Sequence, residues 1–349
     1  MTSHSPARKG AWLALSAAAL FGLSTPLVQH FGQGIGVFTT AGLLYVGAAA
    51  VAAWLRRPAS REARLTRGDA PRLLCMAFFG AVLGPVALAW GLQRTSGTSA
   101  SLMLTLEAVF TAVLAWRMYG ETMDRRVAAA LLLLVAGGGT LVFDQSLADG
   151  NQLLGLLAVL GATAAWGLDN SLSRGVAERD PGQVVLYKSA LGATAAPLLA
   201  LLFAEPLPAW TDAVALLAVG ATGYGLSLRL YLLAQRTFGA GRTGSVFGFA
   251  PFLGALGAWA MGSRSGTWLL ALGGTLMLLG VALHLLEGHD HAHVHEELEH
   301  EHAHSHDDGH HLHTHEPMPT HPHSHWHQHS PAQHAHPHVP DAHHLHTHN

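Results

Sequence analysis

The chain has 349 residues, of which half are apolar and only 12% are charged, and its formal net charge is −3 at pH 7. Soluble domains usually carry about 25% charged residues, so this composition excludes an ordinary soluble domain and favours a membrane protein. The single cysteine, Cys75, excludes an intrachain disulfide. No nucleotide-binding or catalytic motif occurs, so we expect no enzyme, no nucleic-acid partner and no required cofactor.

Apolar segments of the length that crosses a bilayer follow one another along the chain. A bilayer core about 30 Å thick requires roughly 20 apolar residues in a helix. Short connections rich in Gly, Pro, Asp and Arg separate the segments. The sequence therefore predicts an all-α membrane protein with ten transmembrane helices. Their expected ranges are 10–29, 36–55, 73–92, 98–116, 127–143, 152–170, 183–203, 212–234, 243–262 and 266–286.

The basic residues predict the orientation. If the N-terminal segment 1–9 is cytoplasmic, the inner segments hold 15 of the 19 Lys and Arg residues, and the outer loops hold only Arg94 and Arg264. Lys and Arg concentrate on the cytoplasmic side of membrane proteins. We therefore expect a multi-pass protein of a bacterial-type inner (plasma) membrane, embedded in the lipid bilayer, with both termini in the cytoplasm.

The chain also contains an internal repeat. Shifted by 142 residues, 93–121 aligns without gaps on 235–263, with identity at eight of 29 positions. Shifted by 145, 10–27 aligns on 155–172 with seven of 18 identical, and Phe21 lies opposite Trp166. Biased composition alone gives about two or three matches in such windows. Two windows at nearly the same shift indicate a duplicated unit.

Each predicted unit, 10–145 and 152–287, contains five helices. Because five is odd, the second unit enters the membrane from the opposite side. Inverted repeats of this kind are frequent in secondary transporters, whose substrate lies near the midplane between the halves. Within the helices, Gly84-Pro85 and Pro251 predict interruptions that neighbouring groups or cavity water must satisfy.

Several of these stretches resemble a known family. The segments ALFGLST and AAWGLDNSLSR carry an aromatic-Gly pattern, LTLEAVFTAVLAWRMYGE closes in Gly-Glu, and GFAPFLGALGAWAMG contains Pro251-Phe252. Over roughly 10–286 the chain resembles EamA-type transporters of the drug/metabolite transporter superfamily. It departs from their pattern at Ser263, where the family often has Glu. The resemblance implies ten helices and transport of small metabolites, often export, and it fixes no substrate.

Charges at membrane depth cost about 2.5–3.5 kcal/mol on insertion scales, so each requires a reason. Glu107 lies about ten residues into the fourth predicted helix, near the midplane. It is a candidate carboxylate for proton coupling or substrate binding. The alternative is a structural carboxylate held by donors of the third or ninth helix.

Asp169 and Asn170 end the sixth predicted helix, and Lys188 lies at a similar depth in the seventh. A pair between them is expected, either as part of a substrate or coupling site or as a clamp between helices; Lys188 could also snorkel to the headgroups. Arg229, deeper in the eighth helix, could bind an anionic substrate or neutralise Glu107.

Two aromatic residues beside glycines, Trp166 and Tyr224, are the best aromatic candidates for lining a cavity. Aromatic side chains in such proteins are more often packing or interfacial residues, and that alternative stays open for both.

The segment 288–349 differs in kind from the rest of the chain. From His289 onward it holds 24 of the 27 histidines, nine acidic residues and no Lys or Arg. It cannot build an apolar core, so it is predicted to be disordered. Neutral imidazole binds divalent zinc, nickel and cobalt, so we expect metal binding; pH sensing and a passive extension are the alternatives. The first candidate ligands are His289, His291, His293, His295, His300, His302, His304, His306, His310, His311, His313 and His315.

The sequence thus favours a secondary transporter of a small organic solute, with an exporter as the preferred direction and a tail that binds divalent metal. A metal-ion transporter with the tail as ion collector is the second hypothesis, and a membrane-anchored metal store is the third. In the helices only His30 and His284 could contribute imidazoles, each alone. A homodimer, the substrate and the coupling ion are left open.

Overall fold

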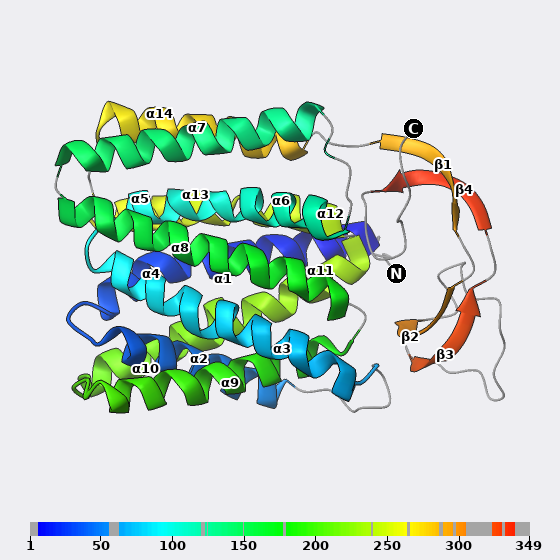
Figure 1. Ribbon diagram of the computed structural model, residues 1–349, viewed down its shortest axis with the longest axis horizontal. Helices are drawn as coiled ribbons and strands as arrows, with labels where there is room; N and C mark the ends of the chain where they lie inside the picture. The colour runs from blue at the N-terminus through cyan, green and yellow to red at the C-terminus, as the bar shows by residue number, and fades with distance from the viewer. Residues whose placement is uncertain are drawn as a thin grey trace, which may run out of the picture.

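The computed structural model describes residues 6–55, 63–119, 123, 125–148, 150–176, 179–238, 240–263, 266–285, 289–295, 298–304, 323–329 and 332–338. Within these ranges, residues up to 285 form a bundle of roughly parallel helices (Figure 1). Many large apolar side chains of the described helices are exposed on the outside of the bundle, such as Trp54, which is 82% exposed. A lipid environment removes the cost of that exposure.

The first half of the bundle runs from α1 to α7. Its elements are α1 (Pro6–Phe31), α2 (Val37–Trp54), the 3-10 turn η2 (Arg67–Asp69), α3 (Ala70–Ala77), the π turn η3 (Phe78–Leu83), α4 (Gly84–Leu92), α5 (Gly97–Met103), the 3-10 turn η4 (Leu104–Leu106), α6 (Glu107–Tyr119) and α7 (Arg125–Ala148). The elements η2 to α4 form one continuous rod, and so do α5 to α6.

The second half follows the same plan. Its elements are α8 (Gly150–Ser173), the 3-10 turn η5 (Arg174–Val176), α9 (Pro181–Leu202), α10 (Trp210–Val219), the π turn η6 (Gly220–Leu226), α11 (Ser227–Phe238), α12 (Ala240–Phe247), α13 (Ala250–Ala260) and α14 (Trp268–Leu285). Here α10 to α11 form the rod that corresponds to η2 to α4.

In the described part of the chain, eight helices are long and apolar enough to cross a membrane, from Gly10–Phe31 to Trp210–Ala234. They agree with the first eight predicted segments, and the protein is a multi-pass membrane protein. The last two predicted segments correspond to shorter apolar helices, Ala250–Ala260 and Trp268–Leu283. The count of ten spans therefore stays a prediction.

The duplicated sequence is matched by a duplicated backbone. The π turns η3 and η6 begin at Phe78 and Gly220, at the shift of 142 that aligns the sequence. Packing follows the same symmetry: α2 contacts α9, α7 contacts α14, and the contact of α1 with α11 has its counterpart in that of α8 with α4 (Figure 1). The two halves therefore interlock rather than lie apart.

Two equivalent glycines allow close approaches between neighbouring helices. A Cβ on Gly22 of α1 would lie 2.2 Å from the carbonyl oxygen of Ala250, and a Cβ on Gly167 of α8 would lie 2.5 Å from the Cβ of Phe110. Gly22 and Gly167 occupy the same repeat position. Small residues let helix backbones approach closely where apolar burial gives little drive for association.

Polar contacts join the halves at both ends of the bundle. At one end the Glu205 carboxylate accepts hydrogen bonds from the backbone N–H groups of Phe38, at 3.1 Å, and Thr39, at 2.7 Å, in the first turn of α2. A carboxylate there also interacts favourably with the helix dipole. At the other end, Arg179 lies 3.2 Å from Asp69.

The backbone of four tail segments forms strands, and the disorder of the tail stays a prediction. The segment β1 (His289–His295) pairs antiparallel with β4 (Ala332–His338), and β2 (Leu298–His304) pairs with β3 (His323–His329). The alternating His-x-His pattern has the two-residue period of a strand, which the sequence reasoning did not weigh. Of the predicted metal ligands, His306, His310, His311, His313 and His315 lie outside the described residues.

Candidate functional site

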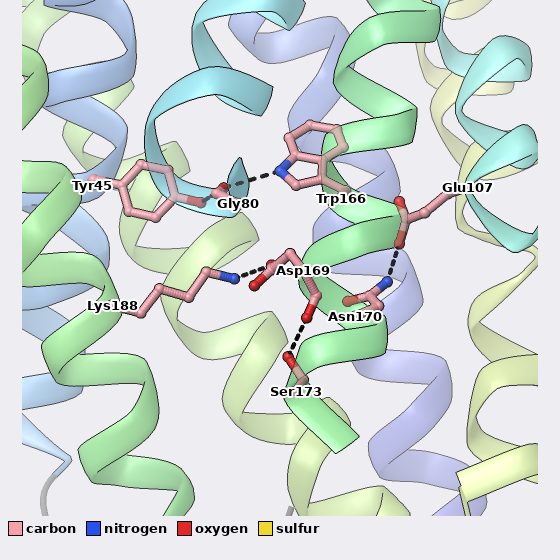
Figure 2. A network of polar contacts seen from close by, with 8 residues as sticks. All are labelled: Tyr45, Gly80, Glu107, Trp166, Asp169, Asn170, Ser173 and Lys188. Atoms are coloured by element: carbon pink, nitrogen blue, oxygen red, sulfur yellow. Dashed lines mark hydrogen bonds and ion pairs between the residues drawn. The ribbon is translucent and has the colours of Figure 1, made fainter. Parts of the chain in front are cut away.

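A cavity of about 70 Å³ lies among helices of both repeats, large enough for several waters or part of a small solute. Most of its lining belongs to the second repeat. The lining residues are Phe21, Tyr45, Glu107, Trp166, Asp169, Asn170, Lys188, Gly223, Tyr224, Ser227, Leu228, Tyr231 and Phe247. Figure 2 shows the polar contacts around it.

One wall of the cavity is organised by a backbone carbonyl. In the π turn, the Gly84 N–H donates to Phe79 rather than to Gly80, and Pro85 has no N–H to offer. The Gly80 carbonyl is left to accept from side chains: Tyr45 Oη donates at 2.6 Å and Trp166 Nε1 at 3.0 Å (Figure 2). A freed backbone acceptor in a membrane helix must find such donors, so the π turn fixes both aromatic side chains.

Below that carbonyl lies an ion pair. Lys188 of α9 donates from Nζ to Asp169 Oδ2 of α8, and the two side chains are only 6% and 4% exposed (Figure 2). The pair that their similar depth suggested is therefore present. A buried pair of this kind offsets the desolvation of each charge, and loss of either partner is costly.

The ion pair fits because residue 80 has no side chain. A Cβ on Gly80 would lie 2.2 Å from Asp169 Oδ2 and 2.8 Å from Lys188 Nζ. Gly80 thus lets α8 and α9 bring their charged groups against the backbone of the third helix.

Glu107 begins α6, directly after the 3-10 turn, and accepts a hydrogen bond from Asn170 Nδ2 (Figure 2). Its donor comes from the sixth predicted helix, so the expected donors of the third or ninth helix are not the ones found. Asn170 follows Asp169 by one residue. One turn of α8 therefore holds both the contact with Glu107 and the contact with Lys188.

Aromatic rings form the rest of the wall. Phe21 lies 5.8 Å from Trp166, 6.1 Å from Tyr224 and 5.4 Å from Phe247, measured between ring centroids. Tyr45 adds an edge-to-face contact with Tyr224 at 5.8 Å. Such distances are typical of favourable aromatic packing, and the rings enclose the polar groups from several helices.

Six of the seven substrate or coupling candidates line this cavity, and their roles stay predictions. They are Glu107, Trp166, Asp169, Asn170, Lys188 and Tyr224.

The seventh candidate, Arg229, is not among the lining residues. Its Nη1 lies 3.5 Å from the point where a Cβ on Gly182 would stand, at the start of α9. Its proposed role in neutralising Glu107 stays a prediction. Sequence reasoning missed Tyr45, Tyr231 and Phe247 as lining residues. Phe21 carried a signal, since it aligns with Trp166 in the repeat.

A comparison with known protein families shows to which family the chain belongs. The profile of the EamA-like transporter family matches the chain twice, at residues 8–142 and 153–286. The chain belongs to the EamA-like transporter family. The EamA-like match supports two repeats and a membrane transporter rather than an enzyme, as the sequence resemblance implied.

Individual relatives agree with this assignment. A protein of Methanothermobacter thermautotrophicus, described as an uncharacterized transporter, is 26% identical over 240 residues, which are 67% of this chain and 70% of its own. A solved crystal structure superposes with a TM-score of 0.60 over 80% of this EamA-like chain and 98% of its own, at 19% identity. At that identity the likeness concerns the fold alone.

Proposed function

We propose that this EamA-like protein is a secondary transporter that exports a small organic metabolite across a bacterial-type inner membrane. The observation that supports it most directly is the cavity: three charged side chains and an amide lie among helices of both repeats, at membrane depth. Charged groups at that depth are costly and usually mark a substrate or ion pathway.

The position of the cavity in the bundle supports export as the direction of transport. Its lining includes the last turns of α8 and the first turns of α9, which lie toward the end of the bundle that carries the N-terminus (Figure 1). The excess of Lys and Arg supports a cytoplasmic position for that end. A site nearer the cytoplasm suits the loading of an exporter. Ten spans arranged as two inverted repeats complete the proposal.

The tail is proposed to bind divalent zinc, nickel or cobalt. Its paired strands put histidines at matching register positions, such as His291 with His336 and His302 with His325. Transport of the metal itself is the alternative function. The tail favours it, whereas the described residues of the helices contain no group of three or more His, Cys, Asp or Glu that could hold a metal.

Export is tested in inverted vesicles that carry the wild-type protein or Glu107→Gln, with Asp212→Asn as a matched carboxylate-to-amide control outside the cavity. We expect uptake of organic metabolites from a cell extract, measured by mass spectrometry, with loss only in Glu107→Gln. Equal uptake in vesicles with and without the protein contradicts transport. Loss in both variants contradicts the assigned site.

The role of the tail is tested by deletion of 289–349. We expect metal affinity to fall and organic transport to persist without its metal dependence. Zinc or nickel flux into proteoliposomes that falls at low ion concentration after truncation, and recovers near saturation, would favour the metal-cargo alternative. Unchanged metal affinity after truncation would contradict the tail as the binding element.

A further inference from the structure

The formal charges of the described residues that line the cavity do not cancel. Among the described residues that line it, Glu107 and Asp169 are acidic and Lys188 is basic. Lys188 pairs with Asp169, whereas Glu107 is held by the neutral amide of Asn170. With all three groups ionised, these lining residues carry one uncompensated negative charge.

A second carboxylate oxygen is also available. Asp169 Oδ2 receives Lys188, while Asp169 Oδ1 is buried and has no hydrogen-bond partner within the described residues. Buried polar atoms are nearly always hydrogen-bonded, and an exception in a cavity wall requires an explanation. An acceptor of this kind fits a ligand that brings a donor or a positive charge.

The aromatic wall suits the same kind of ligand. Six aromatic side chains line the cavity, and Trp166 and Tyr224 lie 6.5 Å apart between ring centroids. Aromatic faces attract ammonium groups, more strongly when water is excluded, and recognise quaternary ammonium in particular. The same rings bind the apolar part of an organic molecule.

A bare transition-metal ion fits this wall poorly. Such ions take four or more donors, commonly imidazole or thiolate. The lining residues include no His and no Cys. The acidic lining residues are therefore better matched to a cation that carries its charge on a carbon-bearing group.

We propose that the transported solute is a small organic cation, a quaternary ammonium compound or a protonated amine. Its charged group is attracted by Glu107 and by the free oxygen of Asp169, and its apolar part contacts the aromatic rings. This inference rests on the proposed transport function and specifies its substrate class.

Three probes of nearly the same shape test the charge preference. Choline is a permanent cation, 3,3-dimethyl-1-butanol replaces its nitrogen by carbon and is neutral, and glycine betaine adds a carboxylate. Binding to the purified full-length protein is measured by calorimetry. We expect choline to bind about tenfold or more tightly than either other probe, as one charge-assisted contact predicts. Equal binding of the neutral probe, tighter binding of betaine, or no binding of choline overturns the proposal.

Variants separate the site from nonspecific binding. Glu107→Gln is expected to lose the preference for choline, Glu107→Asp to keep part of it, and Asp212→Asn to leave it unchanged. Thermal unfolding of each variant without ligand checks its fold. A preference that survives in Glu107→Gln, or that disappears in Asp212→Asn, contradicts the assigned contacts.

The vesicle experiment distinguishes the two proposals. If the solutes taken up from cell extract are cationic, both proposals stand. If uptake depends on the protein but its solutes are anionic or neutral, the cation proposal fails and transport stands. No protein-dependent uptake removes the transport function itself, and with it the cation proposal.

Discussion

Substitution of Lys188 by Met leaves the Asp169 carboxylate buried without its cation. The side chains of this pair are only 6% and 4% exposed, so bulk solvent does not compensate the charge that loses its partner. Asp169→Asn likewise leaves the buried ammonium of Lys188 without its carboxylate.

We therefore expect each single variant to lose about 3–5 kcal/mol of unfolding free energy, as is typical when one member of a buried pair is removed. The double variant, with Met at 188 and Asn at 169, contains no unpaired charge and should lose much less than the sum of the two. Reversible unfolding in mixed micelles measures all four free energies as a double-mutant cycle.

Single losses below about 1 kcal/mol, or a double variant that loses as much as the sum of the two single variants, would refute the reasoning about this pair.

Three further predictions concern close packing, the bundle end and topology. Gly80→Ala places a Cβ 2.2 Å from a carboxylate oxygen of the pair and should lower the free energy of unfolding by about 1–3 kcal/mol. The control Gly139→Ala, whose Cβ would meet nothing within 4 Å, should lower neither the free energy of unfolding in micelles nor the thermal stability. Glu205→Ala removes the acceptor at the first turn of α2 and should cost about 1–2 kcal/mol by the same assay; no loss would contradict its role as a cap. Reporter fusions at residue 349 and between α7 and α8 should report cytoplasmic and external positions, and an external signal at 349 would overturn the orientation.

The polar half of the cavity could be predicted because charge is conspicuous in apolar helices. Glu107, Asp169 and Lys188 each required a partner at membrane depth, and Asn170 follows Asp169 in the same turn. Their exact partners were not predictable: Glu107 meets Asn170, and not a donor of the third or ninth helix. Which helices face each other depends on packing across the bundle, and a single sequence carries no direct record of that.

The aromatic residues that line the cavity show why part of the site could not be predicted from the sequence. The helix α2 is apolar on all sides, so its sequence does not reveal whether Tyr45 faces lipid or cavity. In the bundle its hydroxyl reaches the Gly80 carbonyl. Gly84-Pro85 did predict an interruption, and the π turn η3 precedes it. The equivalent turn η6 contains no proline, so only its position in the repeat could have indicated it.

A π turn holds one residue more than an α turn, and both repeats contain one at the same place. Conversion of such a turn to α-helix would rotate the segment beyond it by about 100° and displace it by about 1.5 Å along its axis. In the third helix that rotation would carry the Gly80 carbonyl away from Tyr45 and Trp166. In the second repeat it would move Tyr224, which lies inside the turn. Each repeat therefore contains one turn at which a shift of helix register by one residue would couple two movements. The helix would slide along the membrane normal, and the part of it that lines the cavity would rotate.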